Sequence, residues 1–77
     1  MNFGYAIEAL KSGKNVARTG WNSKDMYLFL MKGWELSESF DDCEDSIALK
    51  TAHDTVVIGW IPNQTDMLAE DWCLYSK

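Results

Sequence analysis

The chain has 77 residues, twelve acidic and seven basic, and a formal net charge of -5. Its length predicts one domain spanning residues 1–77, and its charge argues against nucleic acid or an anionic membrane surface as a partner. Two cysteines, Cys43 and Cys73, are too few for a disulfide scaffold and fit no zinc spacing. With no bilayer-length apolar stretch and no signal-peptide pattern, the sequence predicts a cytoplasmic protein.

Residues 2–12 predict an N-terminal helix. Asn2 is a suitable N-terminal cap, and Gly13 is suited to the left-handed conformation that ends helices. One apolar stripe at helical spacing marks the face expected to meet the core; its members are Phe3, Ala6, Ile7 and Leu10.

The rest of the chain alternates short strand-like segments with turns. The expected strands are residues 15–18, 26–31, 47–51, 56–61 and 72–76. Turn residues fill 19–25 and 52–55, residues 34–46 read as an acidic loop, and Pro62 is expected to end the fourth strand. Residues 65–71 predict a short helix capped by Thr65 or Asp66. The fold class is therefore α+β, with the N-terminal helix packed on a small antiparallel sheet of four to five strands.

Both faces of the strong strands are apolar. In residues 26–31 one face carries Met26, Leu28 and Leu30, and the other carries Tyr27, Phe29 and Met31. A single helix covers only one face of a sheet, so the second face predicts a homo-oligomer in which a second copy covers it. The alternative is that a curled sheet and long loops cover both faces.

Candidate catalytic groups are few. His53 lies in a predicted turn beside Asp54, where an exposed role is the simpler interpretation. Asp66 paired with Glu70 or Asp71 is the one candidate acid–base pair, although helix capping explains Asp66 equally well. The sequence contains no zinc cluster and no glycine-rich phosphate loop. It therefore predicts no catalytic residue, no metal and no cofactor.

Two segments contain side chains suited to a nucleotide. In "ARTGW", residues 17–21, Arg18 offers a planar fork for phosphate and Trp21 offers a stacking face. In "GWIPNQTDMLAEDW", residues 59–72, the polar "NQTD" cluster offers groups that can bind ribose hydroxyls or a base edge. The alternatives are that Trp21 packs on the core while Arg18 forms a surface ion pair, that the polar cluster is a turn, and that Trp60 and Trp72 are core residues.

The segments "MNFGYAIEALKSGKNVARTGWN", "MYLFLM" and "IALKTAHDTVVIGWIPNQTDMLAEDW" together resemble the Thoeris anti-defense 2 family of small phage and prophage proteins. The resemblance covers nearly the whole chain, and its most specific parts are "VARTGWN" and "GWIPNQTDMLAEDW". It implies a sponge in the infected bacterial cell, which binds a cyclic ADP-ribose isomer made by a TIR-domain defence enzyme and does not cleave it. It also implies cyclic dinucleotides as ligands of some members.

The resemblance further implies a homotetramer, built as a dimer of dimers, with ligand sites between subunits. Carried over by motif, the expected ligand-binding residues are Arg18, Trp21, Asn22, Trp60, Asn63, Gln64, Thr65 and Asp66. On this reading Arg18 contacts the pyrophosphate. Two alternatives stay open: an acidic protein-interaction module that inhibits a host protein directly, and an enzyme that degrades a nucleotide signal through Asp66 or His53.

Overall fold

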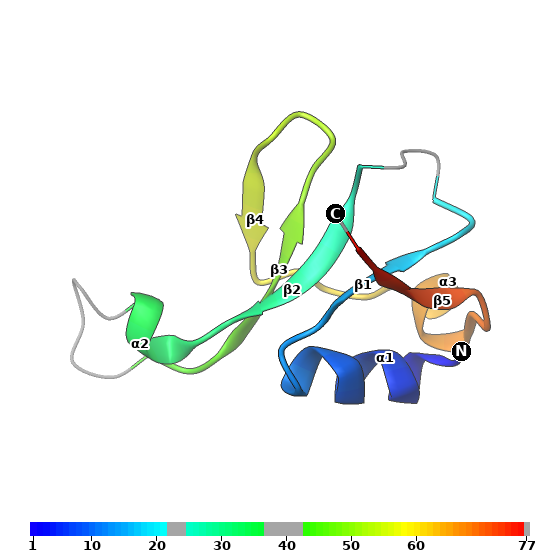
Figure 1. Cartoon of the computed structure of the whole chain (residues 1–77), viewed down its shortest axis with the longest axis horizontal. Helices are drawn as coiled ribbons and strands as arrows, with labels where there is room; N and C mark the ends of the chain where they lie inside the picture. The colour runs from blue at the N-terminus through cyan, green and yellow to red at the C-terminus, as the bar shows by residue number, and fades with distance from the viewer. Residues whose placement is uncertain (22–24, 37–42, 77) are drawn as a thin grey trace.

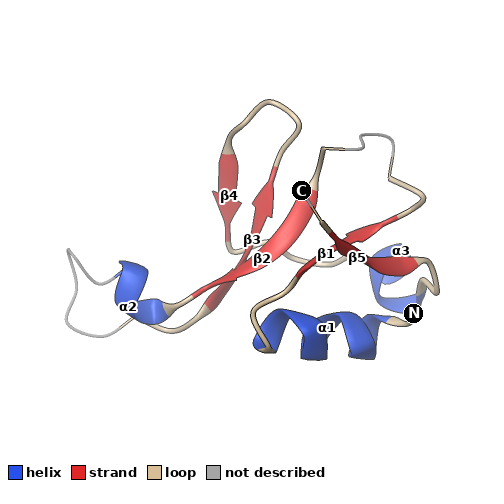
Figure 2. Ribbon diagram, in the orientation of Figure 1, coloured by secondary structure: helices blue, strands red, loops and turns tan. Residues whose placement is uncertain are grey.

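A computed structural model describes residues 1–21, 25–36 and 43–76. One helix lies across one side of a twisted, five-stranded antiparallel sheet whose strand order is β4-β3-β2-β1-β5 (Figures 1 and 2). The elements in chain order are α1 (Phe3–Lys11), β1 (Asn15–Arg18), β2 (Tyr27–Met31), α2 (Gly33–Leu36), β3 (Ser46–Lys50), β4 (Val56–Ile58), α3 (Gln64–Leu68) and β5 (Trp72–Tyr75). The predicted α+β class and N-terminal helix are confirmed.

The helix α1 begins and ends as its sequence predicts. The Oδ1 atom of Asn2 accepts the backbone N–H of Tyr5 at 2.9 Å, and Gly13 adopts a φ of 92° after the last turn. Ala6 and Leu10 are buried against the sheet, with Phe3 packed beside them. The expected apolar stripe is therefore the face through which α1 contributes to the core.

The strand register places the rest of the core on this same side of the sheet. Val16 of β1 pairs with Leu28 of β2, which pairs in turn with Leu49 of β3, and residues directly opposite one another share a face. Arg18 pairs with Trp72 at the start of β5. The fully buried cluster consists of Ala6, Leu10, Val16, Leu28 and Trp72.

The opposite face of the sheet carries an aromatic cluster. Tyr27 and Tyr75 stack with ring centroids 4.5 Å apart, and Phe29 lies 6.0 Å from Tyr27. Neither α1 nor α3 lies on this face, because both pack on the side that holds Trp72. The edge strand β4 is about half exposed along its whole length. The second apolar face predicted from the sequence is thus present.

One expectation for the middle of the chain is wrong. Residues 34–46 were expected to be a loop, yet the turn of helix α2 covers Gly33–Leu36. Gly33 is buried, its N–H donates to Asp45 at 2.8 Å, and a Cβ atom there would overlap the carbonyl oxygen of Cys43. The helical turn therefore depends on contact with the segment that enters β3, which local sequence does not reveal.

The second half of the chain requires two further corrections. Strand β4 ends at Ile58, before the predicted limit of residue 61, because Gly59 takes a φ of 83° and leaves the strand conformation ahead of Pro62. The N-terminal cap of α3 is Asn63, whereas Thr65 or Asp66 was expected. Asn63 takes this role because its side chain reaches the N–H of Asp66.

Candidate functional site

The two segments singled out in the sequence meet around Trp72. This indole is 1% exposed, and Trp21 packs edge-on against it with ring centroids 5.6 Å apart. Trp60 packs against another side at 6.2 Å, also nearly perpendicular. Trp21 and Trp60 are half-buried, so both keep some contact with solvent. Trp72 is a core residue, as the alternative interpretation held, and it supports the other two indoles.

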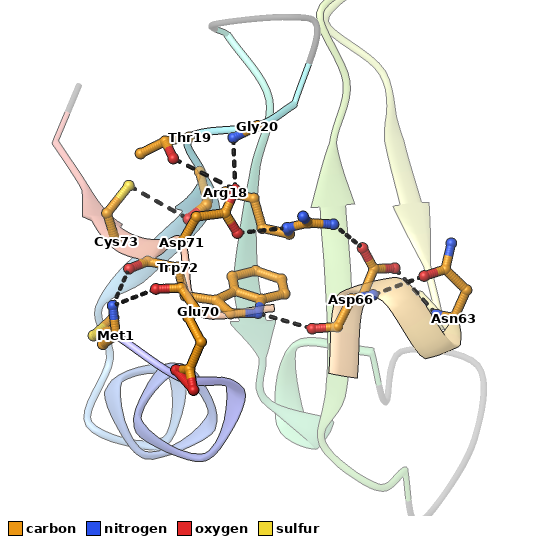
Figure 3. Close-up of polar contacts among 11 residues, drawn as sticks. Met1, Arg18, Thr19, Gly20, Asn63, Asp66, Glu70, Asp71, Trp72 and Cys73 are labelled. Atoms are coloured by element: carbon orange, nitrogen blue, oxygen red, sulfur yellow. Dashed lines mark hydrogen bonds and ion pairs between the residues drawn. The ribbon is translucent and has the colours of Figure 1, made fainter. Parts of the chain in front are cut away.

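Arg18 lies between two carboxylates in a mostly buried setting (Figure 3). Its Nε atom donates to Oδ1 of Asp71 at 2.8 Å, and its Nη1 atom donates to Oδ1 of Asp66 at 3.0 Å. The hydrogen bond to Asp71 is the main cause of a raised Arg18 pKa, and the bond from Arg18 is the main cause of a lowered Asp71 pKa. One guanidinium therefore balances two carboxylates, which leaves this group of three side chains with a net charge of about -1.

Asp71 also shapes the turn that precedes Trp21 (Figure 3). Its Oδ2 atom accepts the N–H of Gly20 at 2.8 Å and the hydroxyl of Thr19 at 3.4 Å. A Cβ atom on Gly20 would lie 2.8 Å from that same oxygen. Because Arg18 holds the carboxylate, the oxygen has little freedom to move, and the tight approach favours glycine here.

Asn63 and Asp66 form a reciprocal cap at the start of α3. The Oδ1 atom of Asn63 accepts the N–H of Asp66 at 2.8 Å, and Oδ2 of Asp66 accepts the N–H of Asn63 at 3.1 Å. Together with the bond from Arg18 to Oδ1, the cap explains how Asp66 can be 8% exposed, since both of its oxygens have partners. Gln64 and Thr65 lie between the two capping residues, and both are exposed.

The structure thus brings together most of the expected site residues and gives some of them structural contacts. Arg18 and Asp66 are joined directly, and Trp21 and Trp60 share the indole of Trp72. Asn22 lies outside the described residues. Asp71, considered in the sequence only as an acid–base partner, proves central. The pairing of Arg18 with Trp72 in the β1–β5 ladder places Asp71 nearby, and no local motif could have revealed it.

Of the residues considered for catalysis, Asp66 and Asp71 meet at Arg18, and the others lie elsewhere on the chain. His53 is exposed, and its backbone N–H donates to the hydroxyl of Thr51 at 3.2 Å. Asp54 pairs with Lys50 at 2.7 Å. Glu70 is exposed. Within residues 1–21, 25–36 and 43–76, no three or more His, Cys, Asp or Glu side chains gather as a potential metal site.

Two other surface features do not belong to the cluster. A shallow depression on the N-terminal part of α1 is lined by Asn2, Gly4, Tyr5 and Glu8 and includes none of the expected ligand-binding residues. In the described portion of the chain, every helix is too short or too polar to cross a membrane.

Comparison with known proteins agrees with the resemblance noted in the sequence. A family model described as the Thoeris anti-defense 2-like domain matches residues 1–75. The protein named Thoeris anti-defense 2 from Bacillus phage SP01 is 42% identical over 86 aligned positions, which cover 99% of this chain and 96% of the phage protein. The chain therefore belongs to the Thoeris anti-defense 2-like family.

Proposed function

We propose that the protein is a phage anti-defence protein that captures a cyclic nucleotide immune signal and holds it intact. The ligand is a cyclic ADP-ribose isomer made by a TIR-domain enzyme in the infected bacterial cell, and its capture leaves the downstream effector inactive. The observation that carries this proposal is the meeting of two distant segments around Trp72, which packs against Trp21 and Trp60 and is bonded to Asp66 of α3. Membership in a family named for anti-defence supports it.

The exposed groups of this cluster suit a nucleotide better than a reaction. The two half-buried indoles, Trp21 and Trp60, are the groups proposed to stack on the ligand, and one stacked base is worth about 1–3 kcal/mol. Gln64 and Thr65 are exposed and carry uncharged donors and acceptors for base edges or ribose hydroxyls. A Kd of about 10 nM corresponds to roughly -11 kcal/mol, and a cyclic ligand has little torsional freedom to lose on binding.

The carboxylates of the cluster support capture without cleavage. A general base works best when its pKa lies near the operating pH, whereas Arg18 lowers the pKa of Asp71 and makes this carboxylate a weaker base. Asp66 and Asp71 each use one oxygen for Arg18, and each uses the other for a backbone N–H. Both are therefore engaged in holding the structure together.

The assembly proposed with this function is a homotetramer built as a dimer of dimers, with ligand sites between subunits. The half-exposed edge strand β4, with Val56, Val57 and Ile58, supports it together with the partly buried aromatic residues of the same sheet, because a second copy offers a matching apolar surface. Light scattering coupled to size-exclusion chromatography measures the mass. A tetramer of the 8.8 kDa chain is expected, and a monomer at all concentrations would contradict the assembly.

Isothermal titration calorimetry with the purified cyclic ADP-ribose isomer tests the binding itself. A saturable exothermic titration with a Kd in the nanomolar range is expected, and cyclic dinucleotides form the second ligand series. The proposal would be contradicted if the titration gives no binding heat and the isomer does not elute with the protein in size-exclusion chromatography. It would favour the other candidate, an interaction module whose acidic charge and apolar edge strand inhibit a host protein.

A further inference from the structure

We infer that Arg18, Asp66 and Asp71 form a frame that positions the ligand-binding groups, and that Arg18 does not contact the ligand's phosphates. This inference rests on the proposed function and deepens it, because it assigns recognition to the uncharged groups around the frame. Those groups are the side chains of Trp21, Trp60, Asn63, Gln64 and Thr65.

The surroundings of Arg18 argue against a phosphate contact. Two of its nitrogens already donate to carboxylates at 2.8 and 3.0 Å, and its side chain is 15% exposed. A phosphate brought to this guanidinium would meet two negative charges against one positive charge. If it displaced Asp66, a carboxylate that is 11% exposed would lose its charged partner, which is strongly unfavourable.

The frame links both parts of the expected site in one chain of hydrogen bonds (Figure 3). At one end, Asp71 accepts the N–H of Gly20, and the N–H of Trp21 donates to the carbonyl of Arg18 at 3.2 Å. At the other end, Asp66 accepts the N–H of Asn63. Arg18 joins the two carboxylates, so the turn that carries Trp21 is connected to the start of α3, where Gln64 and Thr65 lie.

Arginine is required for this role by its shape. The Nε and Nη1 atoms lie in one rigid plane and reach two carboxylates that belong to different elements. A lysine ammonium is a single compact charge on a flexible stem and does not reproduce this fork. If Arg18 has a positioning role, lysine at this position should not restore ligand affinity although it keeps the positive charge. If Arg18 contacts phosphate, lysine should keep part of that affinity.

The experiment compares the full chain with D71N, R18K and R18Q by calorimetry with the cyclic ADP-ribose isomer. If Arg18 bound the ligand's phosphate, D71N would free it from Asp71, and the affinity for the isomer would rise or stay unchanged. The frame predicts that D71N weakens binding at least about fivefold, as expected when one stacked base is lost. D54N is the matched control, because it removes the same charge from a residue paired with Lys50 on the β3–β4 hairpin, and its affinity is expected to be unchanged.

The arginine variants provide an independent result. R18K and R18Q are expected to lose similar affinity, with the salt dependence of Kd equal to that of the unmodified protein. Retention of affinity by R18K, together with a large loss and a flatter salt dependence in R18Q, would overturn the inference. The same holds if D71N binds as tightly as the unmodified protein.

A structural readout separates failure of the frame from failure of the proposed function. The near-ultraviolet circular dichroism of the packed indoles reports the position of Trp21 without any ligand. D71N and R18K are expected to change this signal in folded protein, whereas D54N is not. If the unmodified protein does not bind the isomer but these signals change as expected, the proposed function fails and the frame stands. Unchanged signals in both variants would overturn the frame itself.

Discussion

The indole Nε1 atom of Trp72 donates to the backbone carbonyl of Asp66 at 2.9 Å, within the buried interior. This bond ties the first residue of β5 to α3, and the N–H of Trp72 is bound in turn by the carbonyl of Met1 at 3.1 Å. The strand, the short helix and the start of the chain are therefore held by one residue, which also supports Trp21 and Trp60.

Replacing this indole should destabilise the whole fold. Trp72→Phe removes the hydrogen bond to Asp66 and leaves unfilled volume in the core, so a loss of about 2–4 kcal/mol in the free energy of unfolding is expected. Urea denaturation followed by circular dichroism measures it. A loss below about 0.5 kcal/mol, the level typical of surface changes, would show that Trp72 does not hold these elements together.

The half-buried indole of Trp21 is expected to stack on the ligand. Trp21→Ala should weaken capture by the equivalent of about 1–3 kcal/mol, or roughly fivefold to 150-fold in Kd, while the oligomer persists. Calorimetry and light scattering measure the two effects. Trp34→Ala is the control, because Trp34 is 76% exposed on α2 and lies outside the cluster. Equal affinity of both variants would remove Trp21 from the site.

Asn63 has two separable roles that substitution can distinguish. Asn63→Asp keeps an oxygen that caps α3, so stability should be retained, but it removes the amide donors and adds a negative charge. Its affinity for the cyclic nucleotide should therefore fall. Asn63→Ala should lose about 1 kcal/mol of unfolding free energy with the cap. If Asn63→Asp binds normally, the amide makes no contact with ligand.

Acid should weaken the frame at Asp71. The pKa of this carboxyl is lowered in the folded protein, first by Arg18 and also by the N–H of Gly20, from an ordinary value of 3.8. The unfolded chain therefore takes up the proton first as pH falls. The stabilisation is fully present well above pH 3.8 and is lost as pH falls below that value.

The variant D71N tests this pH dependence directly. It should be less stable than the unmodified protein at pH 6, and the difference should shrink between pH 4 and pH 3. Urea unfolding across this range measures both proteins. A difference that stays constant through the acid range would mean that the Asp71 charge does not stabilise the fold.

Elements whose signals are local were predictable from the sequence. The stripe of α1, its Asn2 cap and the strand expected at residues 26–31 rest on periodicity and on neighbouring residues. The structure confirms them, with the strand at Tyr27–Met31. The capping box of Asn63 and Asp66 also has a readable spacing of three residues. The prediction placed the cap at Thr65 or Asp66 because it considered single capping residues and not the reciprocal pair.

The frame was not predictable, because it depends on contacts far apart in the chain. Arg18 and Asp71 are separated by 53 residues and meet because β1 pairs with β5. The sequence showed that Arg18 is suited to an anion, but not that the protein itself supplies two. The turn of α2 was missed for a similar reason, since it depends on the contact of Gly33 with Asp45.

Recovery of the ligand tests the central claim most directly. The protein is incubated with excess cyclic ADP-ribose isomer and passed through a desalting filter. It is then heated to release the bound molecule, which is identified by mass spectrometry. Capture without chemistry predicts that the intact isomer is retained with the protein and released unchanged even after prolonged incubation. A cleaved product in the released fraction, or the isomer left entirely in the first filtrate, would contradict it.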